Sequence, residues 1–195
     1  ESVSEASPEA SPAISPDVPE APSGTVPEYD TEPETGELQL PPLDRQREIL
    51  AISVLWATDQ EMIPYDPGES MYFWRAVAAL ANLSIEPEAG AIRISSHTLN
   101  QFVGALFGGY TQQYPSLGEE NPFVSEYNQD GETWYQVRSM DLSPLTIRLS
   151  PGDDENSLHA ELLDSGTPAA AGLLRFQDVP ASEAFACCVM NLDVE

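Results

Sequence analysis

The sequence contains no lysine, and this absence fixes the sign of its charge. Its seven basic residues are all arginine and stand against 33 aspartates and glutamates, so the formal net charge is −26. A field of that sign repels phosphate backbones and anionic lipid surfaces, and we expect no nucleic-acid partner. The general consequence of such a charge is solubility, and a salt-adapted source is a second interpretation.

Long apolar runs are also absent. No stretch of about 18 apolar residues occurs, so nothing in the sequence predicts a membrane-spanning helix. The chain begins in a low-complexity segment, and we expect a mature form from which a leader has been removed. Any membrane attachment would then depend on that removed leader or on a lipid anchor.

Cysteine is rare, and its two copies, Cys187 and Cys188, are adjacent. In a strand, neighbouring side chains point to opposite faces, so we interpret them as two small buried hydrophobic residues rather than a redox pair. Zinc-ligand spacing, phosphate loops and dinucleotide fingerprints are all missing, and we expect no cofactor and no metal. The acidic run Asp153–Glu155 lacks the alternating ligands of a calcium loop, which favours a solvated turn.

The first 44 residues differ in composition from the rest. They hold nine of the chain's 18 prolines, 11 of its 33 carboxylates and no basic residue. Such a segment buries too little apolar surface to offset its ordering entropy. We therefore predict an unfolded, extended acidic tether over 1–43 and a single globular domain over 44–195.

Three helices are predicted between residues 44 and 109. Asp44 is a good N-cap for a helix over 44–58, and Asp66 caps a second over 67–82. The second helix is apolar nearly all round, so we predict that it lies buried in the middle of the domain. The third starts at Ser95 or Ser96 and stops at two glycines, 108 and 109.

The pattern then changes to strands with alternating apolar residues. Asn128–Gly131 is a hairpin signal, and alternation predicts one apolar and one solvated face for each strand. The predicted extended segments are 91–94, 123–127, 133–140, 145–149, 158–163, 170–177 and 185–193. We predict an α+β fold, with three N-terminal helices packed on one face of a C-terminal antiparallel meander of four to six strands. Cystatin and NTF2-type folds, in which a sheet wraps on helices, suit this pattern.

Five aromatic residues are the candidate binding residues. They follow the third helix and continue through the first hairpin: Tyr110, Tyr114, Tyr127, Trp134 and Tyr135. Tyrosine and tryptophan offer flat contact area at low entropic cost, which suits sugar or peptide ligands. Because Trp134 and Tyr135 cannot both face inward, one of them is available to a ligand, and the alternative is that these residues fill the sheet core.

The two histidines, His97 and His159, are alternative catalytic candidates. His97 lies at a predicted helix start, and His159 faces the solvated side of a strand beside Glu161. A catalytic triad needs a third partner that converges in space, and no Gly-x-Ser-x-Gly elbow is present.

The segment Arg93–Gly109, RISSHTLNQFVGALFGG, is followed by an aromatic loop, an Asp-Gly hairpin and a strand ending in AELLD. In this pattern the chain resembles uncharacterised exported proteins or lipoproteins of Gram-positive gut bacteria. The resemblance implies extracytoplasmic display, either secreted or at the cell surface. It implies no activity and transfers no functional residues.

Two hypotheses follow. The first is a monomeric, non-enzymatic binding module that is held off the cell surface by the tether and takes a protein, peptide or glycan ligand. The second is a small extracytoplasmic hydrolase that uses His97 or His159 with carboxylates such as Glu161. The second predicts a deep pocket in which a histidine is hydrogen-bonded to an acid.

Overall fold

The computed structural model describes residues 41–58, 65–85, 91–118, 121–180 and 184–194, all within one compact unit, Pro33–Glu195. Nearly all of the predicted tether lies outside the described residues. The elements follow the chain in the order α1 (Leu43–Thr58), α2 (Ser70–Ser84), β1 (Ala91–Ser95), α3 (Ser96–Leu106), β2 (Val124–Gln129), β3 (Glu132–Arg138), β4 (Leu145–Pro151), β5 (Ser157–Asp164), β6 (Thr167–Asp178) and β7 (Cys187–Val194). In this part of the chain, no helix has the length and apolar character needed to span a bilayer.

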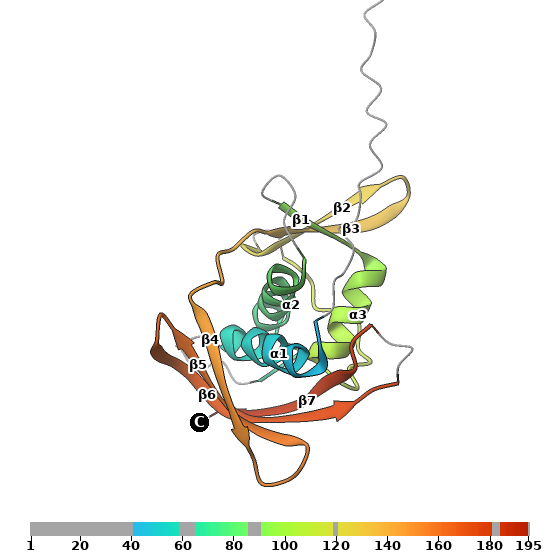
Figure 1. Cartoon of the computed structure of the whole chain (residues 1–195). Helices are drawn as coiled ribbons and strands as arrows, with labels where there is room; N and C mark the ends of the chain where they lie inside the picture. The colour runs from blue at the N-terminus through green and yellow to red at the C-terminus, as the bar shows by residue number, and fades with distance from the viewer. Residues whose placement is uncertain (1–40, 59–64, 86–90, 119–120, 181–183, 195) are drawn as a thin grey trace, which may run out of the picture. The chain divides into compact units, whose positions relative to one another are not determined.

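The predicted α+β class, with N-terminal helices and C-terminal antiparallel strands, is confirmed. The strands do not continue as one meander but divide into two antiparallel sheets. Sheet A has the order β1-β3-β2, and sheet B has the order β4-β5-β6-β7. Figure 1 shows the helices between sheet A at the top and sheet B at the bottom.

The helices explain why two sheets form. In α2, residues 72–74 and 76–81 are buried, and in α1 nearly all residues of the last three turns are buried. A helix that is apolar all round must be covered on more than one side. Sheet B covers α1, sheet A covers α2, and α3 contacts both sheets.

Helix α2 begins later than its sequence predicts. The Asp66 carboxylate accepts the N–H of Gly68 at 2.9 Å, and the Asp66 carbonyl accepts the N–H of Glu69 at 3.0 Å. These bonds close a turn before the helix, so the predicted N-cap, Asp66, is wrong. Glu69 caps the helix instead, because its carboxylate accepts the N–H of Tyr72 at 2.6 Å.

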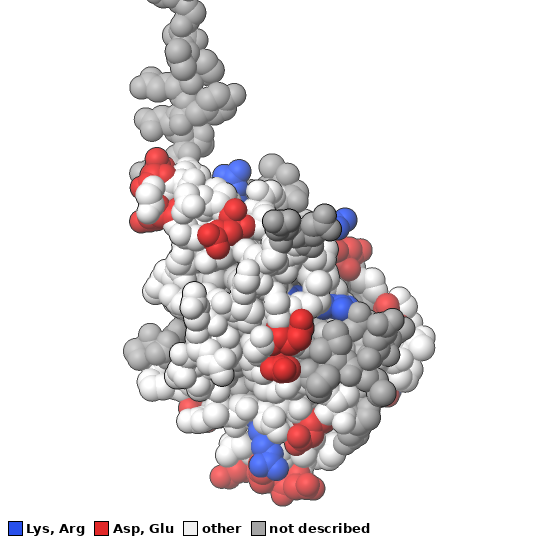
Figure 2. All heavy atoms as spheres, turned by 180° about the vertical axis from the view of Figure 1, so that it is seen from behind, with Lys and Arg blue, Asp and Glu red and all other residues white. Residues whose placement is uncertain are grey.

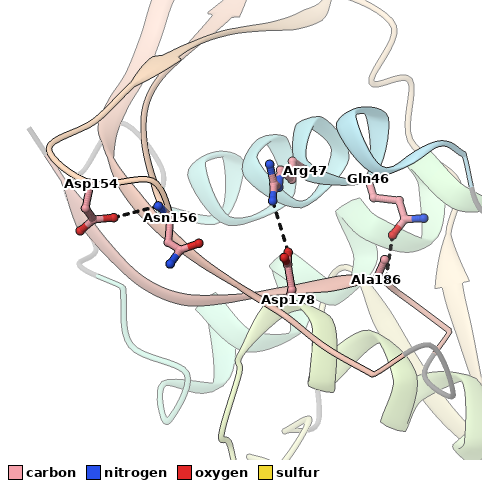
Figure 3. Close-up of polar contacts among 6 residues, drawn as sticks. All are labelled: Gln46, Arg47, Asp154, Asn156, Asp178 and Ala186. Atoms are coloured by element: carbon pink, nitrogen blue, oxygen red, sulfur yellow. Dashed lines mark hydrogen bonds and ion pairs between the residues drawn. The ribbon is translucent and has the colours of Figure 1, made fainter.

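The first helix is tied to the connection between the last two strands (Figure 3). The buried side chain of Gln46 accepts the N–H of Ala186 at 2.9 Å and donates to the carbonyl of Pro41 at 2.8 Å. Arg47, the next residue of α1, forms an ion pair with Asp178 at 3.3 Å. The contacts with Ala186 and Asp178 join α1 to residues more than 130 positions later in the chain. They therefore help to hold α1 against sheet B.

Sheet A is held to the helices at the start of β2. The guanidinium of Arg75 on α2 lies 4.5 Å from the ring centre of Trp56 and 5.8 Å from that of Phe123. Cation–π contacts of this kind are worth about 0.5–2 kcal/mol. The side chain of Asn121 then accepts the N–H groups of Phe123 and Val124, each at 3.0 Å. The start of β2 is therefore held both by these hydrogen bonds and by the contact of the Phe123 ring with Arg75.

Candidate functional site

A cleft of about 900 Å³ opens beside sheet A. Three segments form it: the N-terminal part of α2, the connection between α3 and β2, and the β2–β3 hairpin. Its lining is Trp74, Gln113, Tyr114, Pro115, Ser116, Leu117, Gly118, Asn121, Val124, Ser125, Glu126 and Tyr135. Ligand sites of small molecules and peptides have volumes of about 300–1,000 Å³, so this cleft has the size of a binding site.

Helix α2 fixes the outer wall of the cleft. The indole N–H of Trp74 donates to the carbonyl of Pro115 at 3.0 Å. The hydroxyl of Ser70, one turn earlier on the helix, donates to the carbonyl of Ser116 at 2.6 Å. Residues 115 and 116 are therefore held by a helix although they have no regular secondary structure themselves.

Aromatic rings form the floor and one end. The ring of Tyr135 stacks on that of Trp74, with centroids 5.6 Å apart and an interplanar angle of 29°. Tyr114 packs its ring against Phe73 at 5.6 Å, and its hydroxyl donates to the side-chain carbonyl of Asn100 on α3. Because each ring is held by another ring or a hydrogen bond, the aromatic surface is ordered before any ligand arrives.

A second, smaller cavity adjoins the first at Tyr114. Its volume is about 440 Å³, and its lining includes Tyr110, Tyr114 and Asn100. Tyr110 is fixed there because its hydroxyl donates to the carbonyl of Gln113 at 3.1 Å. The two cavities share Tyr114 and Gln113, so a ligand longer than the cleft has a second place to make contact.

Among the described residues that line the cleft, Glu126 is the one acidic residue, and none is an arginine or histidine. Burial raises the pKa of Tyr135, the negative charge of Glu126 raises it further, and a hydrogen bond with Ser96 lowers it. Burial is also the main reason why the pKa of Tyr114 is raised. Both hydroxyls therefore stay protonated at neutral pH, and in the described part of the lining the formal charge is that of Glu126.

The structure separates the five predicted aromatic residues into two groups. Tyr110, Tyr114 and Tyr135 line the two cavities. Tyr127 and Trp134 are paired across β2 and β3, and alternation along each strand places them on the opposite face of sheet A. The prediction that only one of Trp134 and Tyr135 faces the helices agrees with this geometry, since Tyr135 is buried and Trp134 is half-buried.

The catalytic candidates lie elsewhere. His97 is exposed on α3, where its ring nitrogen is 3.2 Å from the side-chain nitrogen of Gln101. His159 and Glu161 alternate with the buried Ala160 and Leu162, so they lie on the face of sheet B that points away from the helices. Glu161 forms an ion pair with Arg148 at 3.0 Å. Neither histidine lines the cleft.

The cysteines and the acidic turn have structural surroundings. Cys187 and Cys188 are both buried free thiols, as predicted, and burial raises the pKa of each. Asp154 organises its own turn: its carboxylate accepts the N–H of Asn156 at 2.9 Å, and its carbonyl accepts that of Ser157 at 3.2 Å (Figure 3). Within the described ranges, no three His, Cys, Asp or Glu side chains are grouped as metal ligands.

Of the residues that line the cleft, the sequence predicts only Tyr114 and Tyr135, and Trp74 and Glu126 are two that it misses. Trp74 reads as core because α2 is apolar all round, and it is 2% exposed although it lines the cleft. Glu126 lies within a predicted strand, and nothing in its immediate sequence marks it as a site residue. The hairpin signal contains the missing information, because a two-residue turn at Asp130-Gly131 pairs position 126 with position 135 and so places Glu126 beside Tyr135.

Comparison of the chain with protein-family models, with curated proteins and with solved structures gave no match. The described lining offers ordered aromatic faces, hydroxyl and amide groups and one carboxylate, groups that commonly orient a ligand in a binding site.

Proposed function

We propose that this chain is a non-enzymatic binding module, displayed outside the cell membrane, and that its ligand occupies the cleft between α2, residues 113–118 and the β2–β3 hairpin. The observation that carries the proposal is an ordered, aromatic cleft of about 900 Å³ whose lining, among the residues that the structure describes, contains one carboxylate and no histidine. Extracytoplasmic display is inferred from the acidic, proline-rich composition of residues 1–43.

The preorganisation of the cleft supports binding. Trp74 and Ser70 hold the outer wall through hydrogen bonds of 3.0 and 2.6 Å, so this wall need not be ordered when a ligand binds. Immobilising a flexible side chain at an interface costs about 0.5–1.5 kcal/mol, and a preformed site avoids much of that cost.

The charges in the cleft favour recognition over hydrolysis. A hydrolase needs a nucleophile or a general base that is held by a third group. Glu126 is exposed in the cleft lining, whereas Glu161, the acid predicted for the hydrolase, is engaged with Arg148 on the far face of sheet B. A bound molecule would meet aromatic faces and hydrogen-bonding groups rather than an acid–histidine pair.

The test is a peptide array and a glycan array probed with the labelled chain and with Tyr114→Ala. Tyr114 is half-buried and lies at the junction of both cavities, so its loss should weaken binding to authentic ligands by about tenfold or more, as is usual for an aromatic hot spot. His97→Ala is the matched control, because His97 is exposed and lies outside the cleft. Binding that survives unchanged in a folded Tyr114→Ala chain, or turnover of a captured ligand, would contradict the proposal.

A further inference from the structure

The free edge of β2 borders the cleft. In sheet A, β2 pairs only with β3 among the described strands, so its other edge has no strand partner there. The Arg138 N–H donates to the Phe123 carbonyl at 2.9 Å, which identifies 123 and 138 as a hydrogen-bonded pair. Hydrogen-bonded and non-bonded pairs alternate in an antiparallel ladder, so Glu126 and Asn128 direct their N–H and C=O groups toward the open edge.

The cleft runs alongside this edge. Residues 124–126 of β2 form one wall, residues 113–118 form the opposite wall, and Trp74 and Tyr135 form the floor. Side chains of an added strand would alternate between the two faces of sheet A. Those on the inner face would enter the cleft, while the backbone between them would reach the amide groups of Glu126 and Asn128.

The charge of the cleft selects among peptides. Glu126 is exposed and pairs with Tyr135 across the hairpin, so its carboxylate lies at the aromatic floor. Figure 2 shows, on the face it draws, acidic side chains at the sheet A end and again at the opposite end, with few basic ones. Arginine or lysine on a peptide would meet a carboxylate and aromatic rings together, which are the two groups that bind such cations.

We propose that the cleft binds an extended segment of a partner protein that adds as a strand to the free edge of β2 and places an arginine or lysine side chain between Glu126 and the rings of Tyr135 and Tyr114. This inference rests on the proposed function and names its ligand class. The chain's own acidic segment over residues 1–44 contains no basic residue, so its charge does not suit this site. A glycan fits the aromatic rings but cannot pair with a strand edge.

The charge test uses two fluorescent peptides, Thr-Val-Thr-Arg-Thr-Val-Thr and the same peptide with glutamate in place of arginine, in fluorescence anisotropy titrations with the full chain. The arginine peptide should bind about tenfold or more tightly than the glutamate peptide, since one well-placed charge contact is worth about a factor of ten. Glu126→Gln should weaken the arginine peptide by about five- to tenfold, and Glu126→Lys should reverse the preference. Glu132→Gln is the matched control, because Glu132 is exposed on the same hairpin but outside the cleft lining.

The strand test compares Asn128→Pro with Asn128→Ala. Both variants lose the same side chain, but only proline removes the N–H at the open edge, and edge strands tolerate proline at such positions. Asn128→Ala should keep its affinity for the arginine peptide, whereas Asn128→Pro should lose about tenfold. Equal binding by the two variants would refute strand addition, and equal binding of both peptides by the wild-type chain would refute the basic preference.

The two proposals fail in different ways. If the arginine peptide does not bind while a glycan binds in a Tyr114-dependent manner, the peptide inference is wrong and the binding module stands. If the arginine peptide binds but Tyr114→Ala does not weaken it, the cleft is not the site, and both proposals are wrong. Circular dichroism of each variant confirms that the comparison is made between folded chains.

Discussion

Two glycines of similar appearance, Gly104 and Gly108, should respond to alanine with opposite signs. Gly104 lies within α3, and a Cβ atom added there would meet nothing within 4 Å. Alanine is favoured over glycine in a helix interior by about 0.8–1.0 kcal/mol. Gly104→Ala should therefore stabilise the folded chain by nearly 1 kcal/mol.

Gly108 lies just after α3, where the chain passes close to β7. Its N–H donates to the Val189 carbonyl at 2.7 Å. A Cβ atom there would lie 2.5 Å from Met190 Sδ, 2.8 Å from Cys188 Sγ and 3.0 Å from the Val189 carbonyl oxygen. Met190 is 40% exposed and can move away, but Cys188 is only 4% exposed and the carbonyl belongs to the sheet backbone. Overpacking of this kind costs about 1–3 kcal/mol.

Urea unfolding followed by tryptophan fluorescence measures both effects. Together the estimates predict that the two variants differ by about 2–4 kcal/mol, with wild type between them. In thermal unfolding, each kcal/mol corresponds to about 2–4 °C for a chain of this size. Adding Cys188→Ala to Gly108→Ala should recover part of the loss. A Gly108→Ala chain as stable as wild type would show that the contact between α3 and β7 is not as tight as described.

Three further predictions concern stability. Burial raises the pKa of Cys187 from 9.0 to about 11, so between these pH values the folded state keeps a proton that the unfolded state releases. Under reducing conditions, the free energy of unfolding should therefore fall as the pH rises from about 9 to 11. The Cys187→Ala variant should show a smaller fall. Glu69→Ala removes the cap of α2 and should cost about 1 kcal/mol in a denaturant titration, whereas Glu69→Gln should cost less because it keeps an acceptor oxygen. Gln46→Ala leaves the Ala186 N–H without its acceptor and should lower the free energy of unfolding by about 1–3 kcal/mol. Arg45→Ala is the control, because it breaks an exposed ion pair and should lower the same quantity by less than about 1 kcal/mol.

Local signals were sufficient to predict most of the fold. Apolar spacing predicted the three helices, although Ser95 alone of the predicted caps is correct, since Asp44 lies within α1 and Glu69 caps α2. The Asp130-Gly131 signal predicted the first hairpin, and these turn residues have φ of 54° and 83°. The division into two sheets could not be predicted in this way, because it depends on β1 pairing with β3 after a helix and a loop have intervened. Alternation in Ala91–Ser95 shows that a strand is present but does not name its partner.

The candidate site was predicted in part for the same reason. Tyr114 and Tyr135 were chosen by residue type, and long-range packing brings them together. The sequence predicts the burial of Trp74 but not its place in the cleft, because its hydrogen bond to Pro115 depends on a loop 41 residues away. Tyr127 lies on the other face of sheet A from the cleft, and its pairing with Trp134 in the hairpin register indicates this face.

Because the first helix contacts the last strands, its packing can be completed only when nearly the whole chain has been synthesised. Gln46 finds its partner at Ala186, 140 residues later, and α1 packs on all four strands of sheet B. At about 5–20 residues per second, a ribosome needs roughly 7–28 s to add those residues. Until then sheet B lacks β7, so the apolar surface of α1 stays incompletely covered, and a nascent chain halted before β7 should be a good substrate for chaperones and proteases.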